Sequence, residues 1–97
     1  MASNHKLTSL IKGRTIAGTS NQGDTLTIVF DDGSQMTVQT AGSSNSAATG
    51  GKIAAVRQQG TELDLDFDGG GTLAIPLAEE TSSVMVRDKS GVMEYAD

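Results

Sequence analysis

Apolar and polar residues alternate in two short segments of the chain, 26–30 and 63–67. Their apolar positions are Leu26, Ile28 and Phe30 in the first segment and Leu63, Leu65 and Phe67 in the second. Because successive side chains of a β-strand point to opposite faces, each set would lie on one face of a sheet. A glycine-containing turn, "DDGS" or "DGGG", and a further alternating stretch follow each segment. The pattern predicts two hairpins of half-buried strands.

The two hairpins belong to a longer internal repeat. Residues 16–41 align with residues 53–78 without a gap, and nine of the twenty-six positions are identical. The identical pairs are Ile16/Ile53, Ala17/Ala54, Gln22/Gln59, Gly23/Gly60, Leu26/Leu63, Phe30/Phe67, Asp31/Asp68, Gly33/Gly70 and Ala41/Ala78. Each copy predicts a three-stranded meander that is too small to bury a core alone. The repeat has two explanations, duplication of one unit or convergence of two meanders on one pattern, and we favour duplication.

Three further segments complete the predicted architecture. Residues 3–12 predict a short amphipathic helix, and residues 40–51, rich in Gly, Ser and Ala, predict a flexible loop. Residues 83–95 predict a final β-hairpin. Pro76 lacks an amide hydrogen, which predicts that its strand is a sheet edge or carries a bulge. The sequence therefore predicts a mainly β fold: one domain over residues 1–97, with a short N-terminal helix and a small, strongly bent antiparallel β-barrel.

Composition limits the chemistry that this domain could perform. The chain has no cysteine and a single histidine, His5, which excludes disulfides, thiolate zinc sites and metal sites that need two histidines from one chain. Aromatic residues are scarce, so the core is small, and oligomerisation is a reasonable expectation. The polar start and the lack of a long apolar run predict a cytoplasmic protein without a membrane partner. We expect no enzyme activity, no cofactor and no metal site.

Charge is distributed unevenly along the chain. The net charge of −5 argues against broad affinity for nucleic acids. Residues 1–23 nevertheless sum to +3 through Lys6, Lys12 and Arg14, whereas the remaining residues sum to −8. The three cations would either form one positive face or simply solvate the helix.

An acidic run, "DLDFDGG", begins like a calcium-binding EF-hand loop. The match fails because Ile75 stands where a bidentate glutamate is needed, and no helices flank the run. Alternation places Glu62, Asp64, Asp66 and Asp68 on the outer face of one strand. This row predicts a solvated charged face that discourages edge pairing; a weak cation site is the alternative.

The stretch from residue 26 to residue 88 resembles the Sm-like (LSm) family. "LTIVFDDGSQMTV" is similar to the family's first motif, "GKIAAV" to the second half of its long bent strand, "ELDLDF" to its third strand and "LAIPLAEETSSVMV" to its last two strands. The Gly- and Thr-rich repeats also resemble small bacteriophage proteins, including marine phage Sm-like ones. Glu79 and Glu80 stand in the second loop, where the family has Arg-Gly or Lys-His.

The resemblance implies a non-enzymatic subunit that closes into a homo-oligomeric ring, of about five to seven copies, and binds RNA or single-stranded nucleic acid. It implies contacts to nucleic acid from the loop that holds Arg57, Gln58 and Gln59, and we add Lys6, Lys12 and Arg14 from the basic segment. If the gene is a phage gene, the host cytoplasm is the expected setting. The alternative is a structural or adaptor subunit of phage type that binds proteins and no nucleic acid, which the acidic body favours.

Overall fold

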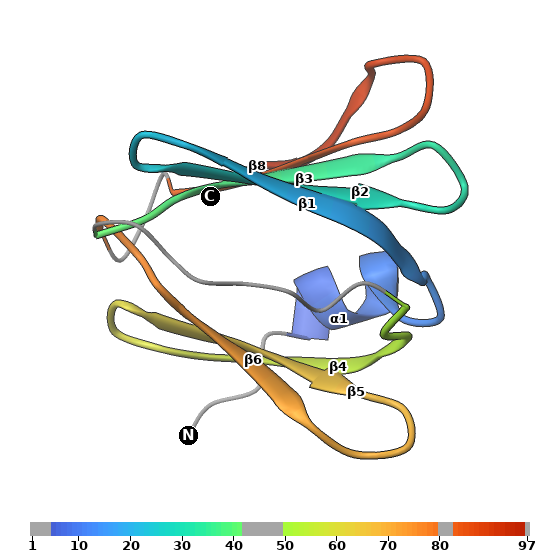
Figure 1. Ribbon diagram of the computed structural model, residues 1–97, viewed down its shortest axis with the longest axis horizontal. Coiled ribbons are helices and arrows are strands. Elements are labelled where there is room, and N and C mark those ends of the chain that lie inside the picture. The colour runs from blue at the N-terminus through green and yellow to red at the C-terminus, as the bar shows by residue number, and fades with distance from the viewer. Residues whose placement is uncertain (1–4, 42–49, 80–82, 97) are drawn as a thin grey trace.

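The computed structural model describes residues 5–41, 50–79 and 83–96 (Figure 1). One helix and eight strands follow in chain order: α1 (His5–Ile11), β1 (Ile16–Gln22), β2 (Thr25–Phe30), β3 (Gln35–Gln39), β4 (Ile53–Gln59), β5 (Glu62–Phe67), β6 (Thr72–Pro76), β7 (Val84–Arg87) and β8 (Met93–Ala96). The expectation of a mainly β chain with a short N-terminal helix is confirmed. Residues 3–4 of the predicted helix and 42–49 of the predicted loop lie outside the described residues.

The strands form two antiparallel sheets that face each other (Figure 1). The first has the order β1-β2-β3-β7-β8, and the second has the order β4-β5-β6. Two isolated bridges connect the sheets, Thr15 with Lys52 and Thr40 with Leu77. No closed barrel is formed by the part of the chain that the structure describes. No helix in that part is long and apolar enough to cross a membrane.

The two copies of the repeat have the same strand register. Ile16 lies opposite Phe30 in the first copy, and Ile53 lies opposite Phe67 in the second, thirty-seven residues later. The same register shift follows each of these pairs, so both first strands carry an irregularity at the same place. The repeated sequence therefore folds twice into one local structure.

Backbone hydrogen bonds between the copies reveal how the two meanders are related. Gly13 N–H donates to the Ile53 carbonyl at 2.8 Å, and Gly50 N–H donates to the Ile16 carbonyl at 2.7 Å. Gly50 lies thirty-seven residues after Gly13, and Ile16 lies thirty-seven residues before Ile53. The second bond is therefore the equivalent of the first with the two copies exchanged. The bridge between Thr15 and Lys52 pairs equivalent positions of the two copies. The meanders are thus related by an approximate internal twofold axis, which favours duplication as the origin of the repeat.

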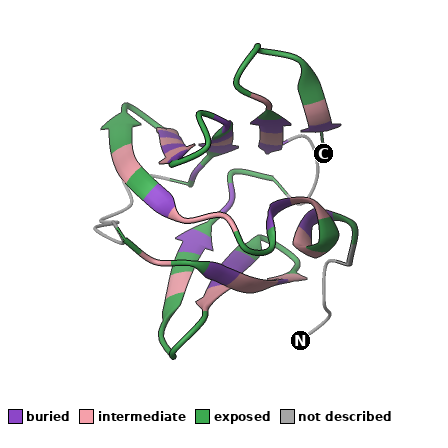
Figure 2. Ribbon diagram, turned by 90° about the vertical axis from the view of Figure 1, so that its right-hand side faces the viewer, coloured by how far each residue is buried: buried purple, intermediate pink, exposed green. Residues whose placement is uncertain are grey.

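Helix α1 lies between the two sheets and contributes to their common core (Figures 1 and 2). Its Leu7 and Ile11 are fully buried with the inward-facing residues of both sheets. The Thr8 hydroxyl accepts a hydrogen bond from Val56 N–H at 2.9 Å and donates to the Val56 carbonyl at 3.2 Å. Since both groups belong to β4, the helix covers that edge of the second sheet.

The β7–β8 hairpin extends the first sheet beyond β3. Val86 lies opposite Met36, and Val84 lies opposite Val38, so two buried valines of β7 are cross-strand neighbours of two buried residues of β3. The turn is closed by Asp88, whose carboxylate accepts backbone N–H bonds from Ser90 and Val92. The β-hairpin predicted for residues 83–95 is present, yet it pairs with β3 and not with β6, the strand that precedes it in the chain.

Candidate functional site

The six residues predicted to bind nucleic acid lie on different elements of the fold. Arg57, Gln58 and Gln59 end strand β4. Lys6 lies on α1, Lys12 follows the helix, and Arg14 precedes β1. Their surroundings differ, and each basic side chain is considered in turn.

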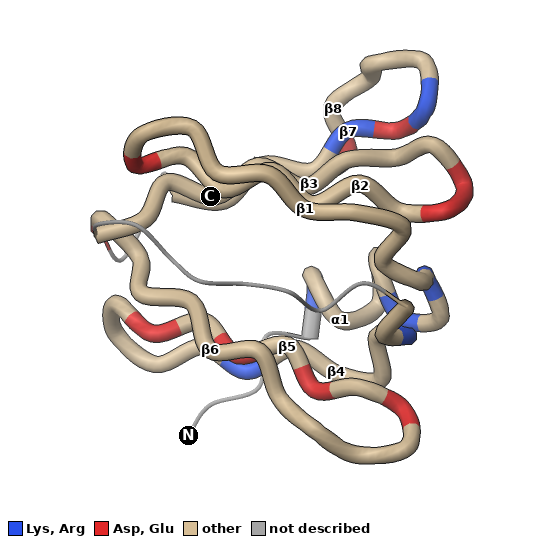
Figure 3. The backbone as a smooth tube through the Cα atoms, in the orientation of Figure 1, with Lys and Arg blue, Asp and Glu red and all other residues tan. Residues whose placement is uncertain are grey.

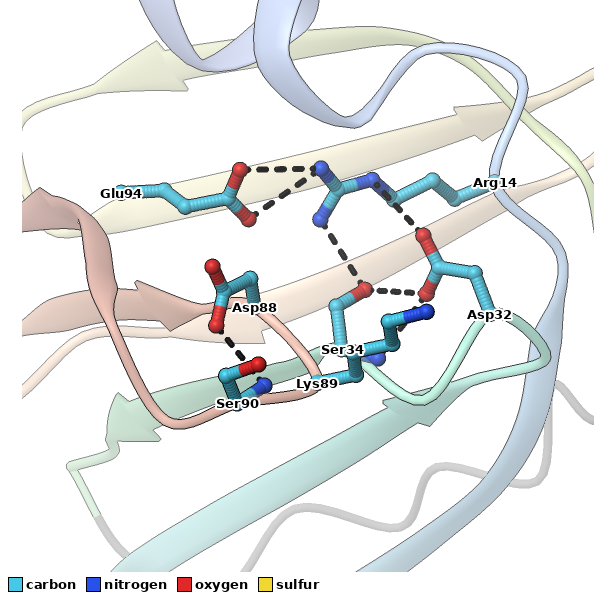
Figure 4. A pocket seen from close by; sticks show the side chains of 7 residues that line it. All are labelled: Arg14, Asp32, Ser34, Asp88, Lys89, Ser90 and Glu94. Carbon is cyan, nitrogen blue, oxygen red and sulfur yellow. Dashed lines mark hydrogen bonds and ion pairs between the residues drawn. The ribbon is translucent and has the colours of Figure 1, made fainter.

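Arg14 holds the C-terminal hairpin against the β2–β3 turn (Figure 4). Its guanidinium donates to Ser34 Oγ at 3.0 Å and to the Glu94 carboxylate at 3.2 Å, and it lies 3.5 Å from an Asp32 carboxylate oxygen. The guanidinium carbon also lies 5.9 Å from the centre of the Phe30 ring. Because its charge is engaged on two sides, Arg14 functions as an anchor between distant parts of the chain.

Asp32 completes this anchor. Its carboxylate accepts hydrogen bonds from both the hydroxyl and the backbone N–H of Ser34. These bonds, together with the charge of Arg14, lower the pKa of Asp32 below its usual value. The hollow around these groups has a volume of about 330 Å³ and is also lined by Asp88, Lys89 and Ser90. Its polar groups bond mainly to one another, which supports a structural role.

A second hollow, of about 610 Å³, lies beside the end of α1. Lys12 and Lys52 line it together with Asp68, and both lysines are exposed. Basic positions gather at this end of the helix (Figure 3). Lys6, by contrast, lies with its Nζ atom 5.8 Å from the centre of the Tyr95 ring. Lys52 was not among the predicted site residues; it lies one residue before the second copy of the repeat begins.

Arg57 lies on the outer face of the second sheet and binds carboxylates. Its Nε and one terminal nitrogen donate to the two oxygens of Asp66 at 2.7 and 2.8 Å. Thr72 Oγ1 donates to the same carboxylate at 2.7 Å. The bidentate bond lowers the pKa of Asp66, with a smaller effect from Thr72, and raises the pKa of Arg57. The predicted contact of Arg57 with nucleic acid would therefore compete with an ion pair that is already formed.

Asp64 departs from the predicted solvated row of acids. Asp64 is only 5% exposed, because it lies on the central strand of the sheet between Arg57 on β4 and Ala74 on β6. Its Oδ2 atom is 3.8 Å from the Arg57 guanidinium, and its Oδ1 atom is buried without a hydrogen-bond partner. The described residues contain no group of three acidic or histidine side chains that could hold a metal ion.

Strand β6 is an edge strand of the second sheet, in agreement with the prediction from Pro76. Phe67 N–H donates to the Gly71 carbonyl and Leu77 N–H donates to the Thr61 carbonyl. Since backbone bonds alternate along an antiparallel strand, the N–H and C=O groups of Thr72 and Ala74 point away from β5. Thr72 and Ala74 are exposed.

The equivalent edge of the first sheet is occupied. Strand β3 corresponds to β6 under the internal repeat, and β7 pairs with its outer edge. Gln39 N–H donates to the Ser83 carbonyl there at 2.7 Å; the position equivalent to Gln39 in the second copy is Pro76, which has no such donor. Among the described residues, only the first copy has its edge strand paired with a further strand. In the second copy the chain reaches the edge at the end of β6, where the Pro76 carbonyl accepts a hydrogen bond from Ala41 N–H at 3.0 Å.

No protein-family model matches the chain, and neither a curated protein nor a solved structure shows significant similarity to it.

Proposed function

We propose that the protein is a non-enzymatic interaction subunit that binds an extended segment of a partner protein at the edge of β6. The observation that carries this proposal is the contrast between the two equivalent edges: β3 is paired with β7, whereas no further strand in the described part of the chain pairs with β6. An exposed sheet edge binds an extended peptide by adding it as a further strand. This function belongs to the adaptor class that the acidic body favoured.

The open edge offers both parts of such a contact. Main-chain affinity would come from the outward N–H and C=O groups of Thr72 and Ala74. Apolar contact would come from Leu73 and Phe67, which are half-buried. Their equivalents in the first copy, Met36 and Phe30, are fully buried. There Val86 of β7 lies opposite Met36. A bound strand would therefore cover apolar surface that the second copy leaves exposed.

Selection of peptides from a displayed random library tests this function. The variant Ala74→Pro deletes the central N–H of the edge, and the matched control Ala74→Ser keeps it. Proline is compatible with this strand because Pro76 already occupies an outward-facing position two residues later. We expect peptides that bind the wild type and Ala74→Ser and lose at least about tenfold in affinity for Ala74→Pro. If every selected peptide binds Ala74→Pro with the same affinity as the wild type, the proposal is refuted.

A second candidate function is nucleic-acid binding by an Sm-like ring. It is supported by the sequence resemblance and by the two exposed lysines that line the hollow beside α1. In a cyclic oligomer the hollow would recur around the ring, and weak phosphate contacts would add up. Lys12 and Lys52 would carry this binding, whereas Arg14 and Arg57 would have to leave carboxylates to take part.

Fluorescence anisotropy with short single-stranded RNAs tests the second candidate. Replacing Lys12 and Lys52 together with glutamate should weaken binding by about tenfold or more and flatten its dependence on salt. The matched control, Lys89→Glu, changes the charge at an exposed turn outside this hollow. A monomer in light scattering, or an unchanged salt dependence in the double variant, would contradict the ring hypothesis.

A further inference from the structure

We infer that the partner segment bound at β6 is basic, with apolar residues at alternate positions facing the core and lysine or arginine between them. This inference rests on the proposed function and adds the chemistry of the partner. It follows from three observations: the register of β7 on β3, the charge of the sheet beside β6, and the state of the Asp64 carboxylate.

The chain itself provides a template for the bound strand. On β3, Met36 and Val38 face the buried residues Val86 and Val84. Adding thirty-seven to the two β3 positions gives Leu73 and Ile75 on β6. A segment in the equivalent register would therefore place apolar residues opposite Leu73 and Ile75.

The residues of the bound segment between these apolar positions would face the acidic side of the second sheet. The cross-strand neighbour of Thr72 on β5 is Asp66, and that of Ala74 is Asp64. Residues of the bound segment opposite Thr72 and Ala74 would lie on the same face as these two acids. Acidic positions recur along this sheet (Figure 3), and Glu62 lies on the same face. In the template strand β7, Arg87 occupies the position opposite Gln35, the equivalent of Thr72, and Met85 occupies the position opposite Thr37, the equivalent of Ala74. The first copy has Thr27 where the second has Asp64, so only the second places a carboxylate beside this position.

Asp64 would bind a cation at one defined position, which the overall negative charge of the sheet alone would not do. Its Oδ1 atom is buried without a hydrogen-bond donor, and a carboxylate oxygen in that state costs free energy until a donor reaches it. Only the small side chain of Ala74 separates Asp64 from the open edge. Neighbouring strands are about 4.8 Å apart, so a lysine opposite Ala74 is long enough to cross one strand. The added strand would thereby supply the missing donor.

Three synthetic peptides of about ten residues test this chemistry. All have valine at alternate positions, and the intervening positions are lysine, serine or glutamate. Binding is measured by fluorescence anisotropy at physiological salt, with protection of the Thr72 and Ala74 amides from hydrogen exchange as a second readout. We expect the lysine peptide to bind about tenfold more tightly than the serine peptide, and the glutamate peptide to bind most weakly.

Two variants locate the effect. Asp64→Asn should remove most of the advantage of lysine over serine, whereas the control Asp31→Asn, which removes the same charge from an exposed turn of the other sheet, should leave it unchanged. Ala74→Pro should abolish binding of the lysine peptide. Equal affinity for the lysine and serine peptides, with binding still lost in Ala74→Pro, would overturn the inference and leave the proposed function standing. Lysine-peptide binding that survives Ala74→Pro would overturn the inference, and the library selection would decide the function separately.

Discussion

In the second copy of the repeat, the backbone of one glycine lies close to an aromatic ring. A Cβ atom added to Gly51 would lie 2.7 Å from Cδ1 and 2.8 Å from Cε1 of the Phe67 ring. Real Cβ atoms do not tolerate such distances, so Gly51→Ala requires the ring or the backbone to move. In the first copy the equivalent of Gly51 is Arg14, whose side chain extends past Phe30; the two rings therefore have different surroundings.

The expected cost of Gly51→Ala is that of overpacking a half-buried ring. Forcing one methyl group into a packed site costs about 1–3 kcal/mol of unfolding free energy. For a domain of this size the melting temperature should fall by roughly 5–20 °C. The φ angle of Gly51 lies outside the left-handed range, so the cost comes from the contact with Phe67 and not from backbone strain.

Gly18→Ala is the matched control. An added Cβ at Gly18 meets no atom within 4 Å, and the equivalent position of the second copy is already alanine, Ala55. Removing a glycine from a strand interior should stabilise the protein by about 0.5–1 kcal/mol. The same substitution at two positions of the repeat should thus have effects of opposite sign.

Thermal unfolding followed by far-UV circular dichroism measures these effects. The decisive comparison repeats Gly51→Ala in a Phe67→Ala background, where the obstructing ring is absent and the substitution should cost almost nothing. If Gly51→Ala is as costly there as in the wild type, or if it stabilises the wild type, the assignment of the cost to the Phe67 ring is wrong.

Three further predictions concern polar contacts. Arg14→Met keeps a long side chain but removes its hydrogen bonds, and should lower the free energy of unfolding in urea by about 1.5–3 kcal/mol; no change would contradict its role as an anchor. Thr8→Val leaves the Val56 N–H without the hydroxyl that α1 provides and should cost about 1–3 kcal/mol in the same assay, whereas wild-type stability would show that the contact is dispensable. The lowered pKa of Asp66 means that its bond to Arg57 stabilises the protein above about pH 4 and is lost as the pH falls through the folded-state pKa. Asp66→Asn should therefore be less stable than the wild type at pH 7 and approach it in acid unfolding curves near pH 2, and a constant difference across this range would contradict the pKa shift.

Local patterns predicted the strands well because each depends on a few neighbouring residues. Leu26, Ile28 and Phe30 alternate along the chain, and all three are buried on one face of β2. The gap-free alignment of the repeat likewise corresponded to one shared register. These predictions needed only the period of a strand and the chemistry of a turn.

Predictions that depended on distant pairing were less successful. The burial of Asp64 follows from its central position between β4 and β6, which alternation alone does not reveal. The carboxylate of Glu94 lies eighty residues from Arg14 in the sequence, so no local pattern indicates their contact. The pairing of β7 with β3 also departs from the tendency of consecutive strands to be neighbours. These long-range arrangements separate the predicted nucleic-acid contacts from one another and engage two of their guanidinium groups with carboxylates.

The internal twofold axis also suggests what was gained when the two meanders became one chain. Separate copies would have to associate, and their assembly would depend on protein concentration. A covalent connection replaces that encounter with an effective local concentration in about the millimolar range. Two identical chains related by a true twofold must also present identical edges. A single chain is free of this constraint: β3 is paired with β7, whereas no further strand of the described residues pairs with β6.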